Sequence, residues 1–306
     1  MKYSNLVLDE DVLDNYGKLL LSKGSRLTEE VLYSLKKRDL LEKLSIRDES
    51  ISRVKVASKA ETNNTFVGTV EQYNRETISD LTAVHTASIF KRIPSINIEL
   101  MASASGLVSN LIHLSRSQAW GLPINALTNQ MPWVYSHSVN VAILACSFSY
   151  WLKFDSESIK RIALGALLHD VGKVLIPIEI INKPGKLSKE EWLLIKAHPQ
   201  LGCSMLESYN LSKDIFNIIL QHHERFDAKG YPGGLNGSQI TLPAQLITLA
   251  NIFDGITSNR PYHPYHPYHP SRNLKESLTI LDEERDILFK SYLLDEFKKM
   301  IGISLI

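Results

Sequence analysis

The sequence predicts a mainly α-helical protein with a small α+β module at its N-terminus. Residues 76–306 consist of segments whose apolar residues have helical spacing, separated by loops with Pro and Gly, and strand-like alternation is scarce there. Residues 1–56 instead contain short extended pieces beside glycine turns, followed by one amphipathic helix. The polar stretch 57–75 between them is typical of a linker.

The N-terminal module is expected to combine extended pieces with one helix. Residues 16–24 place apolar positions between glycines, which favours two short extended pieces around turns. Thr28 then opens an amphipathic segment with roughly helical apolar spacing at Val31, Leu32, Leu35 and Leu40. The module carries no catalytic constellation, so we expect it to be regulatory or to serve dimerisation. The helical segment 76–128 could join it to the rest of the chain or form a dimer interface.

Composition and charge argue against several classes of protein. The 306 residues are 44% hydrophobic and 22% charged, so a sizeable core is available and global disorder is not expected. The net charge of +1 provides no field for binding long nucleic acid. The first residues lack a signal pattern, and no apolar run reaches the roughly 18 residues of a membrane span. With Cys146 and Cys203 as the only cysteines, we expect reduced thiols and a cytoplasmic protein.

Histidines and carboxylates inside apolar helical segments are the central observation. The segment Ile162–Lys173 is apolar on most faces and contains His169-Asp170, where an ionised carboxylate is costly unless it is paired or bound to metal. Similar segments contain the other candidates, which are His137, His198, His222, His223 and Asp254. One such histidine alone is more often a hydrogen-bonded core residue than a ligand. Seven buried polar groups would each need a hydrogen-bond partner of their own, whereas one metal cluster would satisfy all of them.

The residue types indicate two transition-metal ions. Mixed imidazole and carboxylate ligands suit iron, manganese, zinc or nickel rather than calcium. Among these we expect iron. One site would use His137, His169, Asp170 and Asp254, and the other would use Asp170, His198, His222 and His223. Asp170 would bridge the two ions through its two oxygens. Two metals about 3.5–4 Å apart hold a bridging hydroxide and stabilise both the attacking and the leaving oxygen, which suits phosphodiester hydrolysis.

At these residues the sequence resembles the HD superfamily of metal phosphohydrolases, which is named for a His-Asp doublet. It is similar, more narrowly, to the HD-GYP subfamily, which hydrolyses cyclic di-GMP. The resemblance implies an all-helical HD-type catalytic domain with core motifs over 137–262, and its metal positions match the seven candidate ligands. The matching stretches are HDVGKVLIP, INKPGKLSKEEWLLIKAHPQLG, HHERFDAKGYPGGLNGSQITL and LANIFDGITSNRPY.

The resemblance also implies residues that contact substrate. Lys173 and Arg260 match cations that grip phosphate in the family, and a guanidinium offers bidentate contacts to phosphate. The alternative interpretation is that Lys173 and Arg260 are ordinary charged residues of the surface. Gly230 and Tyr231 belong to the GYP triplet, whose loop shapes the substrate pocket. Asp170 and Lys173 are therefore the expected catalytic residues.

Three positions depart from the family pattern. Trp133 stands where members with three metals have a glutamate, so we expect two metals and linear pGpG as product, with slower or absent conversion to GMP. His263 replaces a common basic residue, and Ala228 replaces a glycine usual before the triplet. These changes concern substrate affinity and leave the metal ligands intact. The repeat PYHPYHPYHP at 261–270 has histidines that could bind metal, although expansion in a solvent loop is the simpler origin.

The expected function is hydrolysis of cyclic di-GMP by a metal-bridging hydroxide. One alternative is a weakly active or inactive domain that binds metal and nucleotide and signals through a protein partner. Another is a phosphodiesterase for a different cyclic dinucleotide, including mixed cyclic GMP-AMP. A homodimer or a signalling protein is the expected macromolecular partner.

Overall fold

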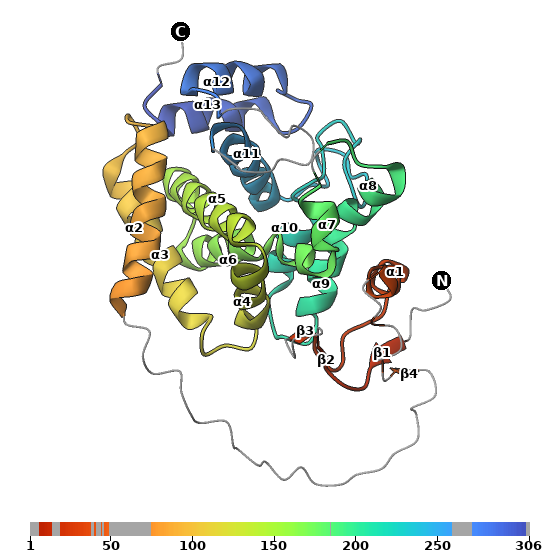
Figure 1. Ribbon diagram of the computed structural model, residues 1–306. Helices are drawn as coiled ribbons and strands as arrows, with labels where there is room; N and C mark the ends of the chain where they lie inside the picture. Colours follow the sequence, from red (N-terminus) through yellow and green to blue (C-terminus); the bar gives the residue numbers. More distant parts are fainter. Residues whose placement is uncertain are drawn as a thin grey trace.

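The computed structural model describes residues 6–13, 19–37, 40, 44, 46–48, 75–183, 185–258 and 271–303. These residues form a mainly helical protein with short strands at the N-terminus, so the predicted fold class is confirmed (Figure 1). The expected linker lies outside the described residues apart from Arg75. Arg260, His263 and the histidine repeat also lie outside them.

In the part of the N-terminal module that the structure describes, there are two small antiparallel strand pairs and one helix. Strand β1 (Leu6–Leu8) pairs with β4 (Ile46–Asp48), and β2 (Val12–Leu13) pairs with β3 (Leu19–Leu21). Helix α1 spans Glu29–Lys37, where the amphipathic pattern predicted it. Within 16–24 the described residues contain one strand, β3, and the expected helix is present as α1.

The remaining elements form a bundle of helices behind this module. The helices before the central doublet are α2 (Arg75–Arg92), α3 (Ile98–Leu114), α4 (Gly121–Gln130), α5 (Pro132–Trp151) and α6 (Ser156–Leu168). The elements after it are the 3-10 helix η2 (Val171–Leu175), α7 (Ile178–Ile181), α8 (Lys189–Lys196), α9 (His198–Leu206), α10 (Lys213–Gln221), α11 (Leu242–Thr257), α12 (Leu274–Glu283) and α13 (Ser291–Met300). Among the described helices, none combines the length and apolar character needed to cross a membrane.

Helix α5 is the central element of the bundle. It is buried without interruption from His137 to Ser149 and packs against α3, α6 and α11. A helix that is apolar on all faces must be surrounded by other helices, which explains its central place. Helix α8 begins with a capping box, in which the side chains of Ser188 and Glu191 each accept a hydrogen bond from the other residue's backbone amide.

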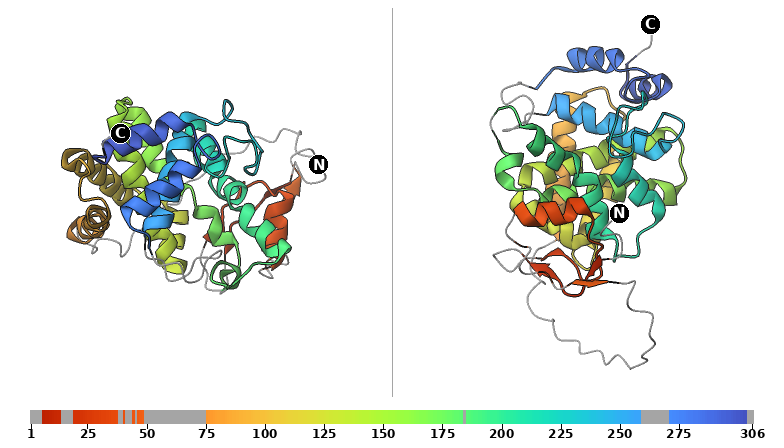
Figure 2. Two further views of the ribbon diagram at one scale, coloured as in Figure 1. Left: turned by 90° about the horizontal axis from the view of Figure 1, so that it is seen from above. Right: turned by 90° about the vertical axis from the view of Figure 1, so that its right-hand side faces the viewer.

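The N-terminal module packs on α4, η2 and α9 of the helical bundle. Its residues Leu8, Val31 and Leu35 are fully buried in the same hydrophobic cluster as the bundle core. Helix α1 contacts η2 and α9, and the buried Ser34 hydroxyl donates a hydrogen bond to the carbonyl of Leu175 at the end of η2. The views in Figure 2 show the module, in red, against one side of the helices.

Candidate metal centre

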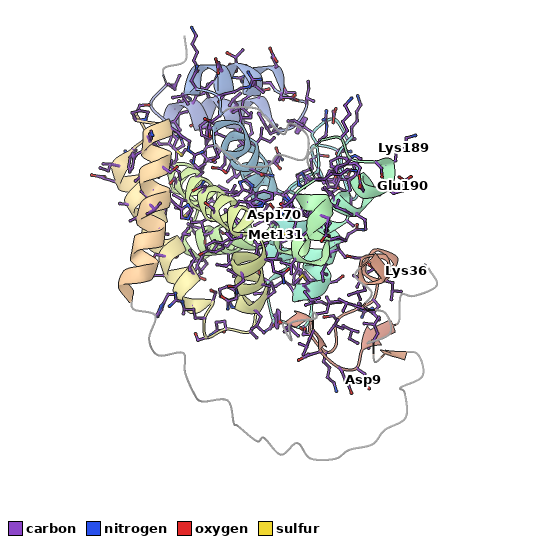
Figure 3. All side chains as sticks on the ribbon, in the orientation of Figure 1. Asp9, Lys36, Met131, Asp170, Lys189 and Glu190 are labelled. Carbon is purple, nitrogen blue, oxygen red and sulfur yellow. The ribbon has the colours of Figure 1, made fainter. Side chains whose placement is uncertain are left out.

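Five separate elements bring the predicted ligands together. His137 lies in the second turn of α5, and His169-Asp170 lie between α6 and η2. The first residue of α9 is His198, the pair His222-His223 follows α10, and Asp254 lies in α11. Figure 3 shows Asp170 in the middle of the bundle, whereas Lys189 and Glu190 lie at its outer edge.

A glycine allows two of these elements to approach each other closely. A Cβ atom at Gly172 would lie 2.0 Å from the carbonyl oxygen of His198 and 2.5 Å from the amide nitrogen of Gly202. No side chain fits between η2 and α9 at this point, so the two backbones are in direct contact. This contact places Asp170, two residues before the glycine, against the ring of His198.

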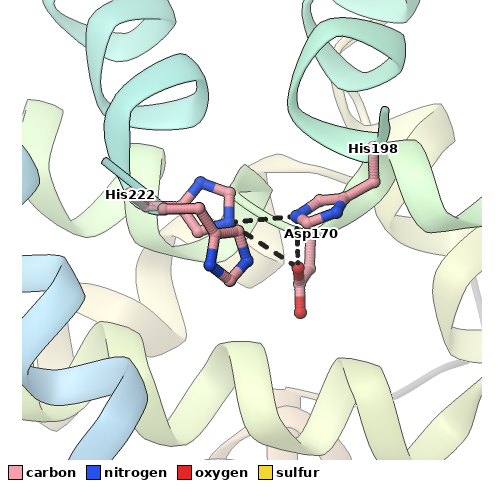
Figure 4. Close-up of side chains that lie close together, drawn as sticks. Asp170, His198 and His222 are labelled. Atoms are coloured by element: carbon pink, nitrogen blue, oxygen red, sulfur yellow. Dashed lines mark hydrogen bonds and ion pairs between the residues drawn. The ribbon is translucent and has the colours of Figure 1, made fainter. Parts of the chain in front are cut away.

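The side chains of Asp170, His198 and His222 converge on one point (Figure 4). Asp170 Oδ1 lies 3.3 Å from His198 Nε2 and 3.9 Å from His222 Nε2. The two Nε2 atoms are 3.1 Å apart. All three residues are buried, so water cannot screen the contacts between them.

Three histidine rings are oriented by the same kind of local hydrogen bond. The Nδ1 atoms of His169, His198 and His222 lie 2.6, 2.7 and 2.7 Å from the backbone carbonyl oxygens three residues earlier. A carbonyl oxygen can only accept, so Nδ1 carries the proton in each ring. Burial lowers the pKa of His198 to about 3 and the pKa values of His222 and His223 well below their ordinary value. The neutral rings of His198 and His222 therefore direct unprotonated Nε2 atoms into the centre.

The centre contains an excess of hydrogen-bond acceptors. Burial raises the pKa of Asp170, but the neighbouring His169 and Lys173 lower it more, so the pKa lies well below its ordinary value and the carboxylate is ionised. Among the described residues, His169 Nε2 and Asp170 Oδ1 are buried without a hydrogen-bond partner. Lone pairs that face one another in a dry interior are costly unless a cation lies between them. The donor set and its orientation fit a transition-metal ion.

The ligand atoms fall into two groups that share one residue. In the first group, His137, His169 and Asp170 have ligand atoms within 4.8 Å of one another. In the second group, Asp170, His198, His222 and His223 meet the same condition. Asp170 belongs to both groups, as the sequence predicts for a bridging carboxylate. The groups could each hold a metal ion, and they contain six of the seven predicted ligands.

The seventh predicted ligand, Asp254, lies beside the first group but is not part of it. Its Oδ2 atom is 2.6 Å from His137 Nδ1. Its Oδ1 atom accepts hydrogen bonds from Arg92 at 2.9 Å and from Asn140 at 3.0 Å. Sequence reasoning missed Arg92, which reaches this carboxylate from the last turn of α2.

A cavity of about 750 Å³ opens onto the centre. Its cationic lining residues are Lys173, Lys196, Arg225, Lys229 and Arg272. Glu224 is the only carboxylate among the described lining residues, and its oxygens are occupied by the backbone amides of Gly233 and Leu235. We call this space the main cavity. Its positive charge and its size suit an anionic ligand of nucleotide class.

Two predicted substrate contacts lie at the main cavity. Lys173 and Tyr231 both line it, and Lys173 Nζ is 2.6 Å from Asp170 Oδ2. The Tyr231 ring stacks on His223 with centroids 4.7 Å apart and an interplanar angle of 18°. A Cβ atom at Gly230 would lie 2.3 Å from the backbone nitrogen of Arg225, so this position requires glycine. The loop is thus held directly above the second group.

Ala228 has a left-handed backbone conformation, with φ at +61°. This conformation costs an L-residue about 1 kcal/mol and favours glycine. We therefore expect Ala228→Gly to raise the free energy of unfolding by about 0.5–1 kcal/mol, measured by urea denaturation. The same change at the exposed helical Ala83 should lower it by about 1 kcal/mol. Destabilisation of equal size at both positions would refute the backbone explanation.

The fold and the site define a helical protein built around a buried histidine–aspartate centre that fits metal ions. The chain belongs to the HD domain family, which matches residues 121–289. This confirms the superfamily indicated by the doublet His169-Asp170.

Similar proteins with curated names support a narrower relationship. The chain is 34% identical to a cyclic di-GMP phosphodiesterase of Pseudomonas aeruginosa over 59% of this chain and 40% of that protein. It is 42% identical to the cyclic di-GMP phosphodiesterase response regulator RpfG of Xanthomonas campestris pv. campestris over 36% of this chain and 30% of that protein. It is also 34% identical to the 3'3'-cGAMP-specific phosphodiesterase 1 of Vibrio cholerae, over 53% and 36% of the two chains. The chain thus spans less than half the length of these relatives.

Proposed function

We propose that the chain is a metal-dependent phosphodiesterase that hydrolyses a cyclic dinucleotide, with cyclic di-GMP as the first candidate and linear pGpG as the product. The observation that carries this proposal is the set of unprotonated, convergent acceptor atoms at the base of a cationic cavity. The names of the similar proteins support the reaction class, since each is a phosphodiesterase of a cyclic dinucleotide.

Two divalent transition-metal ions, with iron preferred to manganese, zinc or nickel, would supply charge stabilisation and water activation when bound. We assign them to the first and second groups, with Asp254 completing the first group beside His137. The bulky Trp133 lines the cavity one turn before His137, which supports two metals in place of three.

The chain itself would orient the diester. Lys173 has a side chain that is 17% exposed, and its amine lies next to the shared carboxylate, so it can approach a phosphate held at the centre. The GYP residues Gly230 and Tyr231 would shape the pocket above the second group. Arg260 stays a predicted phosphate contact outside the described residues.

The N-terminal module is proposed to be regulatory. Its contacts with η2 and α9 support this role, because Asp170 directly precedes η2 and His198 is the first residue of α9. Dimerisation is the alternative role for the module, and the helical segment 76–128 would either join it to the rest of the chain or form a dimer interface.

Lys173→Met removes the charge and keeps most of the side-chain length. We expect metal content to be unchanged and kcat/KM for the cyclic dinucleotide to fall about a hundredfold, as for loss of one donor to a developing charge. Lys189→Met, an exposed change on α8, serves as the control. Full activity of the Lys173 variant would remove this residue from the proposed machinery.

A substrate panel tests the proposed function and its rivals. The metal-loaded chain is incubated with cyclic di-GMP, 3'3'-cGAMP, cyclic di-AMP and linear pGpG, and the products are separated by chromatography. Preferred cleavage of cyclic di-GMP to pGpG supports the proposal, and preferred cleavage of 3'3'-cGAMP supports the second candidate substrate. Tight binding without turnover would favour the signalling module, and neither binding nor turnover would refute the proposal.

A further inference from the structure

Aromatic side chains line the main cavity beside each of the two ligand groups. Trp133 is on α5, four residues before His137 of the first group and therefore on the same face of that helix. Trp192 of α8 and Tyr231 of the GYP triplet lie beside the second group, because the Tyr231 ring stacks on His223. All three aromatic residues line the main cavity.

The indole of Trp133 lines the main cavity. It is only partly buried, and its side chain makes no hydrogen bond or ring contact with the described residues. It lines both the main cavity and a second cavity of about 710 Å³ that shares His137, Ser258 and Arg272 with the first. A tryptophan at the junction of two cavities offers a large flat surface to a ligand.

Trp192 and Tyr231 form the other aromatic surface. Their rings meet edge to face, with centroids 6.2 Å apart and an interplanar angle of 76°. The Lys196 amine lies 5.3 Å from the centroids of both rings. Such a cation beside aromatic rings can contact a phosphate or a purine edge while a ring face stacks on the base.

The ligand class proposed above has two bases joined by charged diesters. We propose that Trp133 and the Trp192–Tyr231 pair are two base-stacking subsites, which hold the two purines while one diester lies over the shared carboxylate Asp170. This inference rests on the proposed function and adds its base-binding residues. Lys173, next to Asp170, and Lys196, next to the second pair, would contact the charged backbone.

The subsites are tested with a hydrolysis-resistant phosphorothioate analogue of cyclic di-GMP and the metal-loaded full chain. Affinity is measured by calorimetry, and tryptophan fluorescence is measured in the same titration. We expect Trp133→Ala and Trp192→Ala each to weaken binding about tenfold or more, with two metals still bound and with partial rescue by Phe. Each Trp→Phe variant should also lose part of the ligand-induced fluorescence change.

Trp151→Phe is the matched control, because this indole lies at the far end of α5 and donates to Glu296 at 3.0 Å. It should alter neither affinity nor the ligand-induced change. Unchanged affinity in Trp133→Ala would overturn the inference, and so would loss of metal in that variant, which would show a structural role beside His137. Absence of analogue binding by the metal-loaded wild-type chain would instead reject the proposed function.

Discussion

Replacing Asp170 with asparagine is expected to lower phosphodiester hydrolysis by about a thousandfold or more and to reduce bound metal to one ion or fewer per chain. Asp170 is the only residue common to both ligand groups, and its carboxylate is ionised and buried. The amide has the same shape but no charge, so it would not neutralise the two proposed cations. Loss of about 4 kcal/mol of charge stabilisation corresponds to a thousandfold in rate.

Two measurements on the same samples check this expectation. Elemental analysis gives the metal content, and initial rates give the hydrolytic activity. Asp214→Asn is the matched control, because Asp214 is an exposed carboxylate that forms a surface ion pair with Arg161. That variant should keep both metals and full activity. If Asp170→Asn retained two metals and wild-type turnover, the shared-carboxylate assignment would be wrong.

Gly172→Ala is expected to destabilise the protein by about 3 kcal/mol or more and to weaken metal binding at the second group. The added methyl group would meet backbone atoms of His198 and Gly202, which cannot rotate away as a side chain can. Separation of η2 from α9 would move Asp170 away from the His198 ring. Urea unfolding and metal titration measure the two effects.

The exposed Gly106 in α3 provides the control for this change. A Cβ atom there has no neighbour within 4 Å, so Gly106→Ala should stabilise the chain by about 1 kcal/mol through helix propensity. Equal stability of the Gly172 variant and the wild-type chain would contradict the close approach of the two backbones.

Local chemistry explains which parts of the fold and site could be predicted. A histidine or aspartate in an apolar helix needs a partner wherever the helix packs, so His198 and His222 could be recognised without coordinates. Helical spacing and the Ser188 capping signal are likewise local. The same reasoning marked Asp170 as a carboxylate that needs a partner, since its doublet ends an apolar helix.

Contacts between distant segments could not be predicted in this way. Arg92 reaches Asp254 across 162 positions, and an arginine near a helix end is usually a solvated charge. The hydrogen bond from Ser34 to the Leu175 carbonyl joins residues 141 positions apart. Neither local sequence pattern indicates this contact. The sequence shows that Trp133 occupies a position where related proteins with three metals have a glutamate. Its place between two cavities, however, depends on how α5 packs in the bundle.

The most direct test of the metal centre is elemental analysis of the full chain purified without oxygen, with cyclic di-GMP turnover followed on the same sample. We expect about two transition-metal ions per chain and formation of linear pGpG. A natively folded chain that binds no transition metal above the level of a His198→Ala/His222→Ala double variant would contradict the central claim.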